Sequence, residues 1–132
     1  MFTGRLTMYS KSTIRGKGQE RTRIKLISGS TNALLYGANS DALWGTNSLS
    51  REDGITIENQ TLDADKANSP NGFGIAIYGP RTRIDKVNII NAGKNGLRTE
   101  WADSSNADGG MEGSFSKIVI DKSCEYIHWV LG

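Results

Sequence analysis

The sequence predicts an all-β fold, a parallel solenoid in which short strands from successive repeats stack on one another. The first observation behind this prediction is a set of apolar landmarks that recurs along the chain at matched spacing. The second is the composition, with 16 Gly against 2 Pro in 132 residues, which favours many tight turns over long helices. Because one repeat of two or three short strands cannot bury its own apolar face, such strands are stable only when repeats stack.

The clearest copy of the repeat is residues 55–63, whose apolar residues lie at spacings that recur twice downstream. Residues 83–89 repeat it at an offset of 27, and residues 115–120 repeat it at a further offset of 31. Two apolar landmarks keep step in every copy and predict two inward-facing ladders. The ladders are Ile57, Ile84 and Phe115, and Leu62, Ile89 and Ile120.

A second column follows the first. Residues 74–78 align with residues 96–100 at an offset of 22, and these align with residues 126–130 at an offset of 30. Its inward ladder is Ile75, Leu97 and Ile127. Unequal offsets with unchanged strand lengths indicate insertions in the turns, as expected of a solenoid whose loops vary in length.

Shorter strands are predicted before the first clear repeat. They comprise Leu6 to Met8, residues 12–18 ending in a glycine turn, the alternating residues 23–26, and Leu34 with Leu35. Three long polar loops separate the later strands. They span residues 37–54 with Trp44, residues 64–73, and the glycine-rich acidic residues 102–114.

Composition excludes several classes of function. The 16 basic and 14 acidic side chains are interspersed, so the chain lacks the basic stripe of a nucleic-acid-binding protein. No apolar run approaches the ~18 residues of a membrane span. The single Cys124 leaves no Cys-based zinc site, and Asp63 with Asp65 offers too few ligands for calcium. We therefore expect no nucleic acid, no membrane, no cofactor and no metal.

Residues 12–18, 22–26 and 55–63 resemble the opening strands of the pectate lyase-like right-handed parallel β-helix superfamily, which includes many bacteriophage tailspikes and polysaccharide depolymerases. The resemblance covers roughly residues 5–130 and concerns the fold. It implies one β-helix domain over residues 1–132, or a fragment of a longer β-helix.

The resemblance also implies a function. The expected protein binds, and in an active form cleaves, a bacterial cell-surface polysaccharide, as a homotrimer in a virion tail or outside the cell. No signal-peptide pattern opens the chain, which favours a virion protein or a fragment. Since this scaffold hosts lyases, hydrolases and plain binding proteins, the alternative is a non-catalytic structural or carbohydrate-binding module of a virion or cell-surface protein.

The outward residues of the second column form the first candidate site. Alternation places Arg98 beside His128 and Glu100 two residues further along the same face. These three are the candidate catalytic residues, with Tyr78 and Trp101 as candidate sugar-binding aromatics. A neighbouring cation disfavours protonation of an imidazole, so Arg98 would leave His128 able to act as a base. The competing interpretation is a solvated face whose charges pair across repeats.

An alternative catalytic pair comes from the first column. Asp63 and Asp121 are predicted to point outward two repeats apart with Ile90 between them, at ~10 Å, near the upper end of the carboxylate spacing of inverting glycosidases. The clustered aspartates and Gly-His-Gly turn of polygalacturonases are absent, as is a pectate lyase-like calcium cluster. Whether the chain is an enzyme therefore stays open.

Association is expected on two grounds. An outward Ile90 adds apolar surface, and residues 129–132 end without a polar cap, which leaves strand edges open to pairing.

Overall fold

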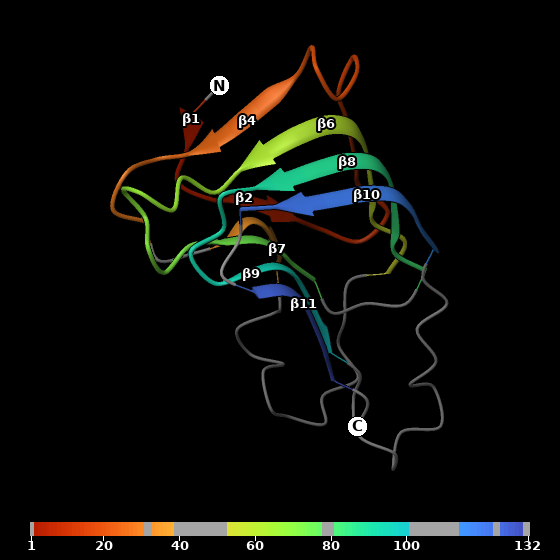
Figure 1. Ribbon diagram of the computed structural model, residues 1–132. Coiled ribbons are helices and arrows are strands. Elements are labelled where there is room, and N and C mark those ends of the chain that lie inside the picture. Colours follow the sequence, from red (N-terminus) through yellow and green to blue (C-terminus); the bar gives the residue numbers. More distant parts are fainter. Residues whose placement is uncertain are drawn as a thin grey trace.

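The computed structural model describes residues 2–30, 33–38, 53–77, 81–100, 114–122 and 125–130. Over these ranges the protein is all-β, with parallel strands in two sheets and no helix (Figure 1). The part of the chain that the structure describes accordingly contains no helix long and apolar enough to cross a membrane.

The first sheet has the order β1-β4-β6-β8-β10, and β3 also pairs with β6. Its strands are β1 (Phe2–Thr3), β3 (Thr13–Arg15), β4 (Arg23–Leu26), β6 (Thr56–Asp63), β8 (Arg83–Ile90) and β10 (Ser114–Asp121). The second sheet has the order β2-β5-β7-β9-β11. Its strands are β2 (Leu6–Met8), β5 (Ala33–Gly37), β7 (Phe73–Ala76), β9 (Asn95–Glu100) and β11 (Glu125–Val130).

From β5 onward the chain alternates between the two sheets and adds each strand beside the previous strand of the same sheet. Figure 1 shows the result as two layers, with β6, β8 and β10 in one and β7, β9 and β11 in the other. Parallel neighbours place equivalent side chains one strand spacing apart, ~4.8 Å. Residues that recur at equivalent positions in the sequence therefore form a row of neighbouring side chains across the sheet.

All three predicted ladders are confirmed by the strand register. Ile57 pairs with Ile84, which pairs with Phe115, and Leu62 pairs with Ile89, which pairs with Ile120. Leu97 pairs with Ile75 on one side and Ile127 on the other.

The main core lies between the two sheets, because its members come from both of them. Ile57, Leu62 and Ile75 are fully buried. Ile118 and Ile120 of β10 are only partly buried. One polar side chain, Gln60, is fully buried in the same register column as Val87.

Each long strand of the first sheet is divided by one residue in the left-handed region. These residues are Asn59 (φ 57°), Lys86 (φ 54°) and Lys117 (φ 52°), and the register aligns them. A left-handed residue departs from the extended geometry of a strand, and Figure 1 shows β6, β8 and β10 bending in the same way. The bend explains how β3 and β4 pair with different halves of β6.

The short predicted strands are also found, since β2, β3, β4 and β5 lie at the expected places. Most of the loop predicted over residues 37–54, and nearly all of that over residues 102–114, lies outside the described residues. Ile90 is half-buried, less exposed than predicted.

Candidate functional site

The outer face of the second sheet carries the first candidate site. The register places Arg98 between Ala76 and His128, as predicted, and it pairs Glu100 with Val130. The side chains of Glu100 and His128 lie outside the described part of the structure, as do Tyr78 and Trp101 entirely. The structure thus places the backbone of Arg98, Glu100 and His128 and the side chain of Arg98 alone.

Arg98 lies beside a small apolar cluster. Its guanidinium carbon is 5.9 Å from the centre of the Phe73 ring, and Phe73 packs against buried Ala33, Tyr36 and Ala76. Cations within about 6 Å of an aromatic face are attracted to it. Tyr36 is buried and lies under Arg5, 4.6 Å from its guanidinium carbon, so its ring is not a platform for a sugar.

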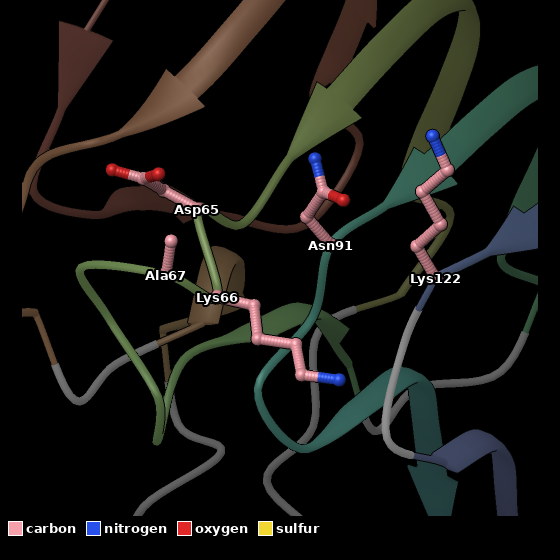
Figure 2. Close-up of a pocket in the computed structure, with 5 residues that line it drawn as sticks. All are labelled: Asp65, Lys66, Ala67, Asn91 and Lys122. Atoms are coloured by element: carbon pink, nitrogen blue, oxygen red, sulfur yellow. The ribbon is translucent and has the colours of Figure 1, made fainter.

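A shallow open hollow of about 420 Å³ lies where β6, β8 and β10 end (Figure 2). It is lined by Asp65, Lys66, Ala67, Asn91 and Lys122. In Figure 2, Lys66 lies on one side of Asn91 and Lys122 on the other. The Asp65 carboxylate lies on the side of the hollow away from Lys122. Both lysines are exposed.

Sequence reasoning did not find this hollow. The alignment of Asp121 with Ile90 does place Lys122 beside Asn91, so one signal was available. Lys66 belongs to the turn after β6, however, and a turn of unequal length has no counterpart in the other repeats from which to position it.

The alternative pair, Asp63 and Asp121, has the predicted register but not the predicted exposure. Ile90 pairs with both aspartates, and Asp121 is exposed. Asp63 is only 2% exposed, so the prediction that it points freely outward is wrong. The reason is that two side chains from neighbouring strands close over it.

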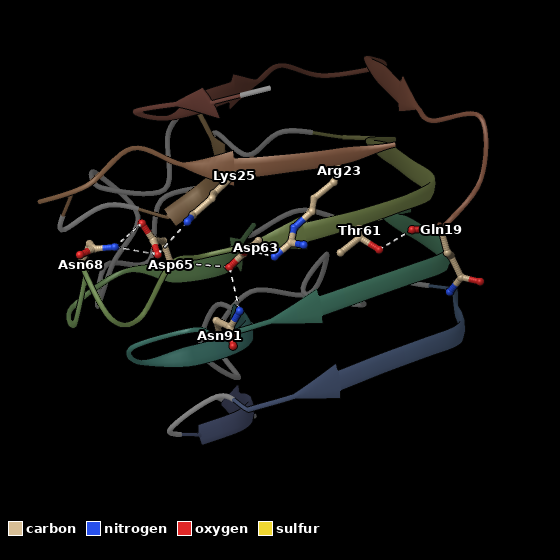
Figure 3. A network of polar contacts seen from close by, with 8 residues as sticks. All are labelled: Gln19, Arg23, Lys25, Thr61, Asp63, Asp65, Asn68 and Asn91. Atoms are coloured by element: carbon tan, nitrogen blue, oxygen red, sulfur yellow. Dashed lines mark hydrogen bonds and ion pairs between the residues drawn. The ribbon is translucent and has the colours of Figure 1, made fainter. Parts of the chain in front are cut away.

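Asp63 accepts hydrogen bonds from three groups (Figure 3). They are the Arg23 guanidinium from β4, the Asn91 amide at 3.0 Å and the Asp65 backbone N–H at 3.0 Å. Asp65 in turn is 3.1 Å from the Lys25 ammonium and accepts from the Asn68 amide at 3.2 Å. Both carboxylates are therefore held in fixed polar contacts, which suits a structural role at the end of β6.

Burial alone would raise the pKa of the Asp63 carboxyl, but the hydrogen bonds from Arg23, Asn91 and the Asp65 N–H outweigh it and, with the Arg23 charge, leave the pKa below its usual value. A carboxyl with a lowered pKa is ionised at neutral pH and is a poor proton donor. Asp63 is thus unsuited to the general-acid role that an inverting pair requires.

This pKa shift predicts how stability depends on pH. A carboxyl whose folded pKa lies below its unfolded value of about 3.9 stabilises the fold above that pH and loses its contribution as pH falls through the folded pKa. Asp63→Asn should cost about 1–3 kcal/mol at pH 7, since it removes charge-assisted hydrogen bonds. Urea unfolding at pH 7, 5 and 3 should show the variant and the wild type converging at the lowest pH.

Asp121→Asn is the control, because Asp121 is exposed on the same strand column and its loss should change stability by less than about 0.5 kcal/mol at pH 7. An Asp63→Asn variant as stable as the wild type at pH 7 would contradict the assigned role.

The outer face of the first sheet carries paired charges. Glu58 and Asp85 are register neighbours. Glu58 accepts from Arg15 of β3, and Asp85 is 3.9 Å from Arg83 and accepts from Ser116. That hydrogen bond and the nearby cations lower the pKa of Asp85. Within the described ranges no group of three or more His, Cys, Asp or Glu residues is arranged to hold a metal ion.

Comparisons with protein-family models, with curated proteins and with solved structures found no match to this chain. The function must therefore be argued from the architecture and the surfaces described above.

Proposed function

We propose that the chain is a right-handed parallel β-helix module of the tailspike and depolymerase type, which binds a bacterial cell-surface polysaccharide. The observation that carries the proposal is the alternation of the chain between two parallel sheets from β5 onward, with each new strand paired in register with the previous strand of its sheet. Recurring bends at Asn59, Lys86 and Lys117 support it further, because they give successive repeats the same shape.

The register favours a binding surface that runs along the stack. In such a module each repeat presents its outward residues to one ligand, and a polymer with repeating sugars matches a surface with repeating strands. The virion-tail or extracellular location and the homotrimer belong to the same proposal. They rest on the resemblance of the sequence to tailspikes.

Cleavage is the less supported half of the proposal. Asp63 is enclosed and its pKa is lowered, which makes it unsuited to the general-acid role and weakens the case for the alternative pair with Asp121. The remaining catalytic candidates are Arg98, Glu100 and His128, with Tyr78 and Trp101 as sugar contacts. A non-catalytic structural or carbohydrate-binding module is the second candidate function, and the fixed contacts of Asp63 and Asp65 favour it.

Three separate variants, Arg98→Ala, Glu100→Ala and His128→Ala, test the site. Each is assayed for binding and cleavage on a panel of bacterial capsular and exopolysaccharides, with folding checked by circular dichroism. If the chain is an enzyme, loss of an acid or base should reduce turnover about a hundredfold or more. Unsaturated products indicate a lyase, and new reducing ends without unsaturation indicate a hydrolase.

The outcomes separate the proposals. Binding without cleavage by the wild type supports the non-catalytic module. Full binding and cleavage by all three folded variants would place the site elsewhere. A wild type that binds no polysaccharide on the panel contradicts the proposed function itself.

A further inference from the structure

We propose that the hollow at the ends of β6, β8 and β10 binds the anionic group of an acidic polysaccharide. This inference rests on the proposed function and deepens it, because it assigns a charge class to the ligand. The site is separate from the Arg98 face, since it is built from the turns that follow the first sheet.

The backbone around the hollow is fixed by hydrogen bonds between neighbouring strands. The Lys66 N–H donates to the Asn91 carbonyl at 2.8 Å, and the Asn91 N–H donates to the Asp121 carbonyl at 3.1 Å. Asn91 and Lys122 both have a φ of 56° directly after their strands. Asn91 and Lys122 therefore leave their strands with the same backbone φ, and Figure 2 shows their side chains beside each other at the hollow.

The hollow keeps a net positive charge. Among the described residues that line it, the one carboxylate is that of Asp65, which is engaged by Lys25 at 3.1 Å and by the Asn68 amide. Among the described residues neither Lys66 nor Lys122 has a carboxylate within ion-pair distance. Two ammonium groups thus remain available to a ligand, and the Asp65 carboxylate of the lining is already paired with Lys25.

Asn91 lies between the two lysines and adds a polar contact. Its amide nitrogen is committed to Asp63 at 3.0 Å, which fixes the orientation of the amide. No described side chain donates to its carbonyl oxygen, so this oxygen is free to accept from a sugar hydroxyl.

The size and exposure of the hollow suit part of a polymer. Its volume of about 420 Å³ lies at the lower end of the range for ligand pockets, ~300–1,000 Å³. Because the hollow is open, one or two sugar residues can occupy it while the chain continues past. Lysine binds carboxylate or phosphate as a flexible point charge. The interspersed charges elsewhere disfavour an extended nucleic acid.

The test compares alginate, which carries carboxylates, with carboxyl-reduced alginate and with a poly(glycerol phosphate) teichoic acid. The protein should bind alginate more tightly than carboxyl-reduced alginate. The teichoic acid shows whether phosphate is recognised as well as carboxylate. Lys66→Gln and Lys122→Asn should each weaken alginate binding about threefold, and the double variant about tenfold. Added salt should reduce all these differences.

Lys86→Asn is the matched control. Lys86 is exposed and has a φ of 54°, so the substitution removes the same charge from the same backbone conformation, at a bend outside the hollow. Asparagine tolerates this conformation, so both variants should fold, and Lys86→Asn should bind alginate like the wild type.

Failure of the inference is distinguishable from failure of the proposed function. Equal binding of neutral and acidic alginate would contradict the assignment of the hollow as an anion-binding site, but not polysaccharide binding itself. Equal losses of affinity in Lys122→Asn and Lys86→Asn would do the same. Duplex DNA bound as tightly as alginate overturns the commitment to a polysaccharide. If no polymer binds, galacturonate is titrated by NMR. Amide shifts confined to Lys66, Asn91 and Lys122 support the hollow, and their absence overturns it.

Discussion

Replacing Leu62 with alanine is expected to lower the free energy of unfolding by about 2–5 kcal/mol. Leu62 is fully buried and pairs with Ile24 on one side and Ile89 on the other. Its side chain therefore fills the centre of a ladder, and neighbouring strands held by parallel hydrogen bonds cannot collapse into the void. Urea unfolding followed by circular dichroism measures the change.

Val119→Ala is the control for this measurement. Val119 lies in β10 and is 55% exposed, so shortening it should change stability by less than about 0.5 kcal/mol. Two variants with equal losses would contradict the assignment of Leu62 to the core ladder.

The ladders were predictable because the two-residue period of a strand and the offset between repeats together allow only one register of the strands. A register shift of one residue would turn every apolar side chain of a strand to the opposite face. With Ile57 and Leu62 both matched in the next two strands of the sheet, only one register buried the whole set. The sequence therefore determined strand order and register more strongly than it determined any single contact.

The surroundings of Asp63 were not predictable in the same way. Alternation correctly put Asp63 on the side of the sheet away from the ladder residues. Its exposure, however, depends on which side chains from elsewhere in the chain cover that side. The Arg23 side chain comes from β4 and the Asn91 side chain from the residue after β8, and a period-2 pattern carries no information on where such side chains end. The lysine hollow escaped prediction for a similar reason, because turns of unequal length cannot be aligned.

The bends were also invisible to composition. Left-handed residues are usually Gly or Asn, and only Asn59 of the aligned bend residues fits that preference. At Lys86 and Lys117 this conformation is adopted against the local preference, at positions that the register aligns with Asn59. Pairing with neighbouring strands thus stabilises a left-handed conformation that the individual lysines would not favour.

At Gly74 the packing of the sheets requires a particular residue, because there is no room for a side chain. A Cβ at this position would lie 2.3 Å from the Gly96 carbonyl oxygen and 2.4 Å from Cγ2 of Ile89. Glycine within a strand often marks such a close approach of another backbone. Because β9 and the first sheet lie on the two sides of the missing side chain, neither neighbour can move without disturbing a ladder.

Gly74→Ala is therefore expected to lower the free energy of unfolding by about 3 kcal/mol or more, at the upper end of the cost of overpacking. Gly4→Ala is the control, because Gly4 is exposed and its Cβ would lie 3.7 Å from the nearest atom, Cγ2 of Ile27. Chemical denaturation of both variants measures the difference. A Gly74→Ala variant with wild-type stability would mean that β7 and β9 lie farther apart than the register requires, and the close packing of the second sheet against the first would have to be abandoned.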